Sequence, residues 1–322
     1  MSSAAVPEAA AERALEGLAA TEGLLADVVG HGPRAVTRPA GQTLAAGGKR
    51  LRPLLVFCSS PTERPLDADL VAAAASVELI HMATLVHDDI LDAADLRRGR
   101  PTVVAAHGAS RAVQVGDFLF ARAFSVLART GSADAVRVLA ATSLDLSNGE
   151  LLQGRAGHDV ALTEDAYLER CRMKTASLFA ASCRLGCLLG GASAEVERRL
   201  ARFGTSVGLA FQIFDDILDL TATADATGKT RGADLRDGTV TLPMILAMRN
   251  EPGLAARIRD AHRGGDVDAV CAELAAHPGT AAARERALGF IADARDAVEA
   301  PLDGIDPLPL AAIADGVVDR YS

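Results

Sequence analysis

Aromatic residues are scarce in this chain of 322 residues. They make up 3% of it, there is no Trp, and only two Tyr are present, while hydrophobic residues reach 49%. β-Strands favour aromatic and β-branched side chains, whereas Ala and Leu, which dominate here, are strong helix formers. We therefore expect an all-α fold with an aliphatic core.

The sequence also lacks linker-like stretches and long apolar runs without a charged residue. A chain of this length would suggest about two domains, but no Pro-, Ser- or charge-rich stretch separates two halves, so we expect one large helical domain over residues 1–322. The most apolar runs, 71–86 and 175–194, contain Glu78 and Arg184. We interpret both runs as buried core helices and expect no transmembrane segment.

Basic charge is in the minority, since 33 Lys and Arg face 42 Asp and Glu, giving a net charge of −9 and a pI near 5.3. This balance argues against nucleic acid as a main partner. The N-terminus has no basic region ahead of an apolar stretch, so no signal peptide is expected. The five cysteines show no zinc-finger or disulfide spacing. Cys183 and Cys187 are interpreted as core thiols, with a metal pair as the alternative, and a cytoplasmic protein is expected.

The pentapeptide Asp-Asp-Ile-Leu-Asp occurs twice, at Asp88–Asp92 and Asp215–Asp219, each time at the end of a long apolar segment. On a helix the first and last Asp of each copy lie on one face. Acidic helix caps are a poor alternative, because the helix dipole is negative at the C-terminus. Carboxylate oxygens select hard cations. The pattern predicts a Mg²⁺ site with the candidate ligands Asp88, Asp89, Asp92, Asp215, Asp216 and Asp219.

Basic residues gather in three loops that contain or border glycine. These are Lys49, Arg50 and Arg52; Arg97, Arg98 and Arg100; and Lys229 and Arg231. In an acidic protein such groups indicate anion binding, since Arg suits phosphate bidentately and Lys acts as a point charge. No P-loop or dinucleotide fingerprint is present. Mg²⁺, arginines and an apolar bundle together suggest a diphosphate ligand with a hydrocarbon tail.

The apolar periodicity predicts helices over residues 8–30, 67–92, 110–129, 133–155 and 194–220. Thr163 is the expected N-cap of a further helix that runs to about residue 189. A loop at Gly47–Pro53 is expected to turn into a helix, Thr221–Thr239 is expected to be a long polar loop, and helices are expected to fill residues 240–320.

Several motifs in one order then resemble a known family. The segments GGKRLRP, ELIHMATLVHDDILDAADLRRGRPT, MKTASLF, FQIFDDILD and GKTRGADLRDGTVTLP are similar to those of the trans-isoprenyl diphosphate synthases, the all-α polyprenyl synthetase family. The resemblance covers most of the chain. It implies a single large helical bundle of the isoprenoid synthase type, a homodimer, and head-to-tail condensation of isopentenyl diphosphate with an allylic diphosphate such as farnesyl or geranylgeranyl diphosphate. The Mg²⁺ cluster is then expected between the two aspartate-rich motifs.

The resemblance also implies roles for individual residues. Asp88, Asp92 and Asp215 would ligate Mg²⁺ on the allylic diphosphate, while Asp89, Asp216 and Asp219 would support the cluster. Isopentenyl diphosphate would be bound by Lys49, Arg52, His81 and Arg98. The allylic diphosphate would be held by Arg97, Lys174, Thr175, Gln212 and Lys229. One departure is Thr239, where the family often has Lys, and this puts the efficiency of allylic binding in doubt.

Product length is expected to depend on Ala83 and Thr84, which precede Asp88 by five and four residues and so lie about 6–7 Å below it. In the family a bulky aromatic at this level stops growth early. These small residues imply an all-trans polyprenyl product longer than C20, with a C20 geranylgeranyl diphosphate synthase as the alternative.

Two rivals belong to other functional classes. A class I terpene cyclase also carries an Asp-rich motif, but it lacks the GGKRLRP and LRRGRPT segments for a second diphosphate. A non-catalytic regulatory subunit of a heteromeric synthase tends to lose its Asp motifs, and both are intact here.

Overall fold

The computed structural model describes residues 8–221 and 231–319. Apart from one short hairpin, every regular element in these residues is a helix, which confirms the all-α fold class. The described chain divides into two compact units, and each is presented by itself. Unit 1 lies within residues 1–143, 178–204 and 297–313, and unit 2 within 144–177, 205–296 and 314–322.

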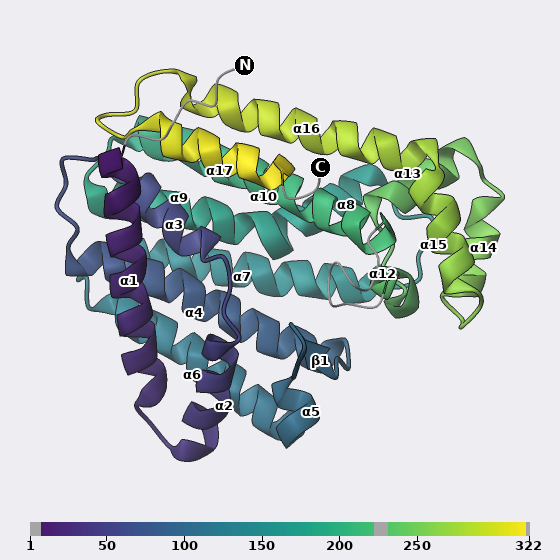
Figure 1. The fold of residues 1–322 in the computed structure, drawn as a ribbon, viewed down its shortest axis with the longest axis horizontal. Helices are drawn as coiled ribbons and strands as arrows, with labels where there is room; N and C mark the ends of the chain where they lie inside the picture. The colour runs from purple at the N-terminus through teal and green to yellow at the C-terminus, as the bar shows by residue number, and fades with distance from the viewer. Residues whose placement is uncertain (1–7, 222–230, 320–322) are drawn as a thin grey trace. The chain divides into compact units, whose positions relative to one another are not determined.

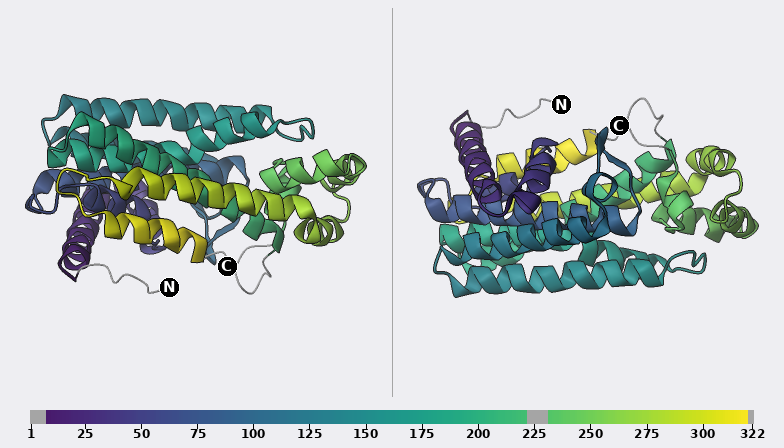
Figure 2. Two further views of the ribbon diagram at one scale, coloured as in Figure 1. Left: turned by 90° about the horizontal axis from the view of Figure 1, so that it is seen from above. Right: turned by 90° about the horizontal axis from the view of Figure 1, so that it is seen from below.

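Unit 1 is built around the helix α4 (Ala68–Leu91), which packs against α1 (Glu8–Gly30), α3 (Leu51–Cys58) and α6 (Ala109–Ala128). In Figures 1 and 2, α1 runs steeply across α4. The remaining elements wholly in this unit are α2 (Arg34–Ala45), the antiparallel strands β1 (Leu96–Arg97) and β2 (Arg100–Pro101), and α5 (Val103–His107). Figure 1 shows the hairpin beyond the C-terminal end of α4, next to α5.

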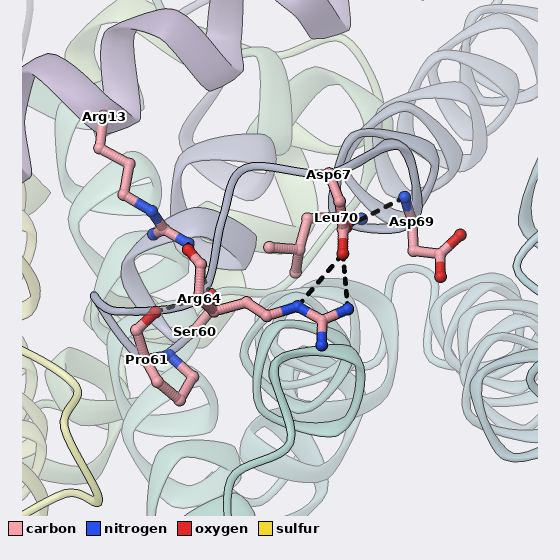
Figure 3. A network of polar contacts seen from close by, with 7 residues as sticks. All are labelled: Arg13, Ser60, Pro61, Arg64, Asp67, Asp69 and Leu70. Atoms are coloured by element: carbon pink, nitrogen blue, oxygen red, sulfur yellow. Dashed lines mark hydrogen bonds and ion pairs between the residues drawn. The ribbon is translucent and has the colours of Figure 1, made fainter.

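The start of α4 is fixed by a side-chain cap, shown in Figure 3. One carboxylate oxygen of Asp67 accepts the N–H groups of Asp69 and Leu70 at 3.2 and 3.1 Å, and the other accepts hydrogen bonds from Arg64. Such a cap satisfies N–H groups that have no partner within the helix. At the other end Ala93 has a φ of 47°, which ends the helix just after the first aspartate motif.

By length and composition α4 could cross a membrane, but 72% of its most apolar window is buried inside the protein. Ala72–Ala75, Leu79 and Ala83 of this helix belong to the buried core of unit 1. The interpretation of residues 71–86 as a core helix is therefore confirmed.

Unit 2 contains the segment from α8 (Glu164–Cys171) through the π-helix η1 (Arg172–Ala176), together with α12 (Ala233–Asp237), α13 (Leu242–Asn250), α14 (Leu254–Ala261) and α15 (Val267–Ala276). Five helices contribute residues to both units: α7 (Ala133–Arg155), α9 (Ser177–Gly190), α10 (Ala194–Thr221), α16 (Pro278–Glu299) and α17 (Pro307–Asp319).

Two expectations about unit 2 need correction. Thr163 is the N-cap, accepting the N–H of Ala166 at 3.3 Å, but the expected single helix to residue 189 is interrupted by η1. The expected loop Thr221–Thr239 is not wholly loop, because residues 233–237 form α12. The carboxylate of Asp219 accepts the N–H groups of Ala233 and Asp234, both at 3.1 Å, and so stabilises the start of this turn. Lys229 lies outside the described residues.

All five cysteines are free and buried. Burial raises the pKa of Cys183 to about 12. The thiols therefore pack as small apolar side chains, as predicted for Cys183 and Cys187.

Candidate diphosphate and metal site

The first aspartate motif forms the last turn of α4 in unit 1. Asp88 is half-buried, Asp89 is buried, and Asp92 is the exposed C-cap. The Nε of Arg97, on the hairpin, donates to Asp89 at 2.7 Å. This ion pair fixes the hairpin against the motif and occupies one oxygen of Asp89.

A cavity of about 320 Å³ opens beside this pair. Three arginines of the hairpin region line it together with polar residues of α2 and apolar residues of α4 and α5. Its lining includes Gln42, Thr43, Leu85, Asp89, Arg97, Arg98, Arg100, Val103, Ala106 and His107. Unit 1 thus places cationic groups and free space directly beside the first motif.

The basic residues at the start of α3 have different surroundings: Arg50 pairs with carboxylates of the protein, whereas Arg52 keeps a donor that a ligand could use. Arg50 is tied to Glu22 at 2.5 Å and to the buried Glu78 at 2.6 Å, so its charge neutralises carboxylates. Arg52 differs, because its buried Nε has no hydrogen-bond partner among the described residues. Burial lowers the pKa of Arg52 to about 10, with partial compensation from Glu78, so the group stays charged at pH 7. A buried cation with an unused donor is suited to an anionic ligand. Lys49 is exposed.

His81 lies among the same cations. Burial of the ring and the neighbouring arginines, Arg52 and Arg98 foremost, hold the pKa of His81 well below its usual value of 6.5. The ring is therefore neutral at pH 7 and offers a hydrogen bond without charge. Gly48 lets the loops approach closely, since a Cβ there would come within 3.2 Å of the Arg98 guanidinium. Unit 1 brings Arg52, His81, Arg97 and Arg98 into one electrostatic cluster.

In unit 2 the second aspartate motif occupies the last two turns of α10. Asp216 is buried, and both of its oxygens accept hydrogen bonds, from the Tyr167 hydroxyl at 2.6 Å and from Gln212 Nε2 at 2.8 Å. Gln212 in turn accepts the hydroxyl of Thr175 at 2.7 Å. Three residues predicted for the site, Thr175, Gln212 and Asp216, therefore form one connected network.

Burial raises the pKa of Asp216 to about 7, although its two donors oppose the shift. Asp234 of α12 has a pKa well above its usual value, because it is buried and because Asp216, Asp219 and Asp215 repel its negative charge. The second motif is thus a place where carboxylates accumulate and where a cation would relieve repulsion.

The carboxylates of both motifs offer only oxygen donors, which are the ligands that Mg²⁺ prefers. Among the described residues no group of three or more Asp, Glu, His or Cys side chains is arranged to hold a metal by itself. Mg²⁺ commonly binds through one or two carboxylates and completes its shell with water and substrate phosphates. The oxygen-only donors and the mutual repulsion in unit 2 fit an ion of that kind.

Lys174 is paired with Glu150 of α7 at 2.5 Å. It lies in η1, a type of helix irregularity that is frequent at functional sites. Gly149 makes this arrangement possible, since a Cβ there would lie 2.5 Å from the backbone N of Lys174.

The two residues expected to set product length differ in exposure, and Arg231 of the third basic loop contacts the end of α10. Ala83 has no exposed surface, whereas Thr84 is partly exposed and donates its hydroxyl to the carbonyl of His81 at 2.9 Å. Arg231 donates to the carbonyl of Leu220 at 2.7 Å, so it caps the end of α10.

The residues that sequence reasoning missed are Tyr167, Glu150 and Asp234. Tyr167 had a usable signal, because it is one of two tyrosines and lies seven residues before Lys174. The ion pair of Glu150 and the burial of Asp234 depend on tertiary packing and left no such signal.

Comparison with known proteins identifies relatives over most of the chain. A family model described as polyprenyl synthetase matches residues 33–274. The nonaprenyl diphosphate synthase of Mycobacterium tuberculosis is 39% identical over 86% of this chain and 84% of its own. Component 2 of the heptaprenyl diphosphate synthase of Geobacillus stearothermophilus is 45% identical over 66% of this chain and 67% of its own.

A geranylgeranyl diphosphate synthase of Methanosarcina mazei also matches, with 40% identity over 63% of this chain and 64% of its own. Among solved structures, a polyprenyl synthase from Caulobacter crescentus, complexed with calcium and isoprenyl diphosphate, has a TM-score of 0.91 and 33% identity, and all of both chains is covered.

Proposed function

The chain belongs to the polyprenyl synthetase family, and from this membership we propose that it is a Mg²⁺-dependent trans-prenyltransferase. It condenses isopentenyl diphosphate with an allylic diphosphate, head to tail, to make an all-trans polyprenyl diphosphate longer than C20. The observation that carries the proposal is in unit 1, where Arg52 lies in a cationic cluster with the neutral His81. The buried Nε of Arg52 has no hydrogen-bond partner within the described parts of the chain.

Isopentenyl diphosphate is bound by the cluster in unit 1. Arg52 and Arg98 neutralise its diphosphate, and Lys49, exposed at the loop, adds a third positive charge. His81 contributes a neutral hydrogen bond and so holds the substrate without adding to the repulsion among the arginines.

The allylic diphosphate is bound by Arg97, Lys174, Thr175, Gln212 and Lys229. Its C–O bond breaks and releases diphosphate, and the double bond of isopentenyl diphosphate attacks the resulting allylic cation. The released diphosphate then takes up the proton that is lost. The ion pairs of Lys174 with Glu150 and of Arg97 with Asp89 hold both cations ready, because each can exchange its carboxylate for a phosphate oxygen.

The carboxylates Asp88, Asp92 and Asp215 are the proposed direct ligands of Mg²⁺, with Asp89, Asp216 and Asp219 in supporting positions. When bound, the ion supplies positive charge that stabilises the leaving diphosphate. The division among the carboxylates is supported by their contacts, since both oxygens of Asp216 and both of Asp219 already accept hydrogen bonds from protein donors.

Product length is proposed to exceed C20 because Ala83 and Thr84 are small, and the nonaprenyl and heptaprenyl synthases among the relatives support this choice. A C20 product is the second candidate, favoured by the match to a geranylgeranyl diphosphate synthase.

We further propose that residues 1–322 act as one polyprenyl synthetase domain, that the chain forms a homodimer, and that it works in the cytoplasm. Five free, buried cysteines are consistent with a reducing compartment. The heptaprenyl relative is named as component 2 of its synthase, so a heteromeric assembly is the competing outcome.

The deciding experiment incubates the purified chain with Mg²⁺, labelled isopentenyl diphosphate and farnesyl diphosphate, followed by mass analysis of the products and light scattering of the protein. Elongated all-trans diphosphates longer than C20 are expected from a dimer of this chain alone. A C20 product supports the second candidate, and a cyclised hydrocarbon would show a terpene cyclase. Absence of turnover until a second protein is added would show a subunit of a heteromer.

A further inference from the structure

The second aspartate motif is held by a residue outside every segment predicted to carry the chemistry. Tyr167 on α8 has no exposed surface, and its hydroxyl donates to Asp216 at 2.6 Å. The other oxygen of Asp216 accepts Gln212 Nε2 at 2.8 Å. The Asp216 carboxylate is thus fixed from two sides by donors that come from two different helices.

The network continues to the predicted substrate residues. Gln212 can donate its N–H to Asp216 and accept from Thr175 only in one amide orientation, and the hydroxyl of Thr175 lies 2.7 Å from its oxygen. One hydrogen-bonded chain therefore runs from Tyr167 through Asp216 and Gln212 to Thr175. A change at its buried end alters the orientation of groups at the other end.

Tyr167 is itself held firmly. The guanidinium of Arg170 lies 5.2 Å from the centre of its ring, and Arg170 also donates to the carbonyl of Val240 at 2.9 Å. Burial and the Asp216 carboxylate keep the pKa of the phenol well above its usual value, so the hydroxyl retains its proton as a donor.

We propose that Tyr167 is a positioning residue for the second aspartate motif, which orients Asp216 directly and Gln212 and Thr175 through it. The inference rests on the proposed function, because it assumes that the motif binds a divalent cation with the allylic diphosphate. Without the hydroxyl, one oxygen of a buried carboxylate loses its donor, and the carboxylate reorients toward the remaining one.

The test is Tyr167→Phe, which removes one hydroxyl and keeps the ring. Partners that orient metal-binding groups typically change metal affinity by about 10- to 100-fold. The Mg²⁺ concentration for half-maximal activity should therefore rise about tenfold, while KM for isopentenyl diphosphate changes by less than about twofold. As a readout independent of turnover, Mn²⁺ binding with inorganic diphosphate, measured by electron paramagnetic resonance, should weaken by about tenfold.

Thr142→Val is the matched control. It removes another buried hydroxyl, which donates to the carbonyl of Val138 at 2.8 Å in α7 and has no part in the network. Metal dependence and Mn²⁺ binding should stay at the wild-type level in this variant.

A double-mutant cycle tests whether Tyr167 affects metal binding through Asp216. In an Asp216→Asn background Tyr167→Phe should weaken Mn²⁺ binding by less than about twofold, because the carboxylate it orients is gone.

These measurements distinguish failure of the proposed prenyltransferase activity from failure of the positioning role of Tyr167. A wild-type protein without prenyl transfer defeats the proposed function. An active wild type with unchanged metal dependence and Mn²⁺ binding in Tyr167→Phe overturns the positioning role. An undiminished effect of Tyr167→Phe in the Asp216→Asn background also overturns it, since Tyr167 would then act by another route.

Discussion

At the scale of single residues, His81 shows how surroundings decide what a side chain can contribute. Its neutrality follows from burial and from the arginines nearby, which disfavour a further positive charge. A neutral ring cannot neutralise phosphate, so its value to the site is a hydrogen bond held in place. Arg52, which affects the pKa of His81 most strongly among these arginines, is the cation proposed to supply the charge.

If His81 acts as a neutral hydrogen-bonding group, two substitutions of it should differ in KM for isopentenyl diphosphate. His81→Gln retains a neutral donor and should keep KM for isopentenyl diphosphate within about threefold of wild type. His81→Ala loses a hydrogen bond to a charged ligand, worth about 1.5–3 kcal/mol, and should raise KM by about tenfold or more. Steady-state kinetics at pH 7.5 check both values. Equal KM values in the two variants would contradict a hydrogen-bonding role.

The same depressed pKa predicts acid sensitivity in the ligand-free protein. The unfolded chain binds a proton at His81 below pH 6.5, while the folded chain does not, so this group's contribution to stability is complete above pH 6.5 and is lost as the pH falls. Urea unfolding at pH 7.5 and pH 5.0 should show a smaller loss of stability in His81→Gln than in wild type. A loss of equal size in both proteins would show that His81 is protonated in the folded state.

At the scale of elements, the π-helix η1 presents Lys174 and Thr175. It packs against α7 at Gly149, where a Cβ would collide with the backbone of Lys174 at 2.5 Å from its N. Backbone contact of this kind cannot be relieved by turning a side chain. The shape of η1 therefore depends on a glycine 25 positions earlier in the chain.

Gly149→Ala is expected to move η1 and with it both predicted substrate residues. We expect a KM for the allylic diphosphate that is raised about tenfold, an unchanged KM for isopentenyl diphosphate, and a stability loss of about 1–3 kcal/mol from overpacking. The control is Gly154→Ala in the same helix, where nothing lies within 4 Å of the added Cβ. That change should leave kinetics unaltered and stabilise the helix by up to about 1 kcal/mol. Similar kinetics in the two variants would remove the special role of Gly149.

The elements also show which parts of the fold could be predicted from the sequence. Helix α7 was predicted at the bounds it has, and α4 and α10 within one residue at each end, because long apolar periodic segments mark where such helices lie. The interruption at η1 was not predicted, and the close approach of Gly149 to Lys174 that accompanies it depends on tertiary packing. Nor was α12, whose first N–H groups are satisfied by the carboxylate of Asp219, 14 and 15 residues earlier in the chain.

For the candidate site, the sequence could indicate the kind of chemistry but not the contacts of each side chain. The residue types and spacing of the aspartates and basic loops predicted the chemistry, because ligand preference follows from donor atoms. Which of them already have protein partners could not be predicted. Arg50 bound to Glu78, Asp216 bound to Tyr167, and Arg231 capping α10 are consequences of tertiary packing.

At the scale of the whole molecule, we propose that product length is limited by how much hydrocarbon the protein can enclose below the first aspartate motif. On α4 the two small residues at that level differ in surroundings, since Ala83 is fully buried and Thr84 is partly exposed. Thr84 lies one turn before Asp88 and on the same face of the helix. A growing chain attached at the motif would therefore meet Thr84 first and reach Ala83 by displacing its neighbours.

Both positions can be tested with an added aromatic ring. Thr84→Phe and Ala83→Phe are expected to shift the product toward C15–C20 diphosphates in a radiolabelled extension assay, because the ring fills space that the later isoprene units require. Ala83→Phe should also cost about 1–3 kcal/mol of stability, since it overpacks a residue without exposed surface. The matched control is Ala74→Phe, equally buried but nine residues earlier and so on the opposite face of α4. It should lose similar stability and still make the wild-type product. If the folded Ala83→Phe protein gave the wild-type distribution of chain lengths, Ala83 would not limit the product, and the boundary would have to lie elsewhere in the protein.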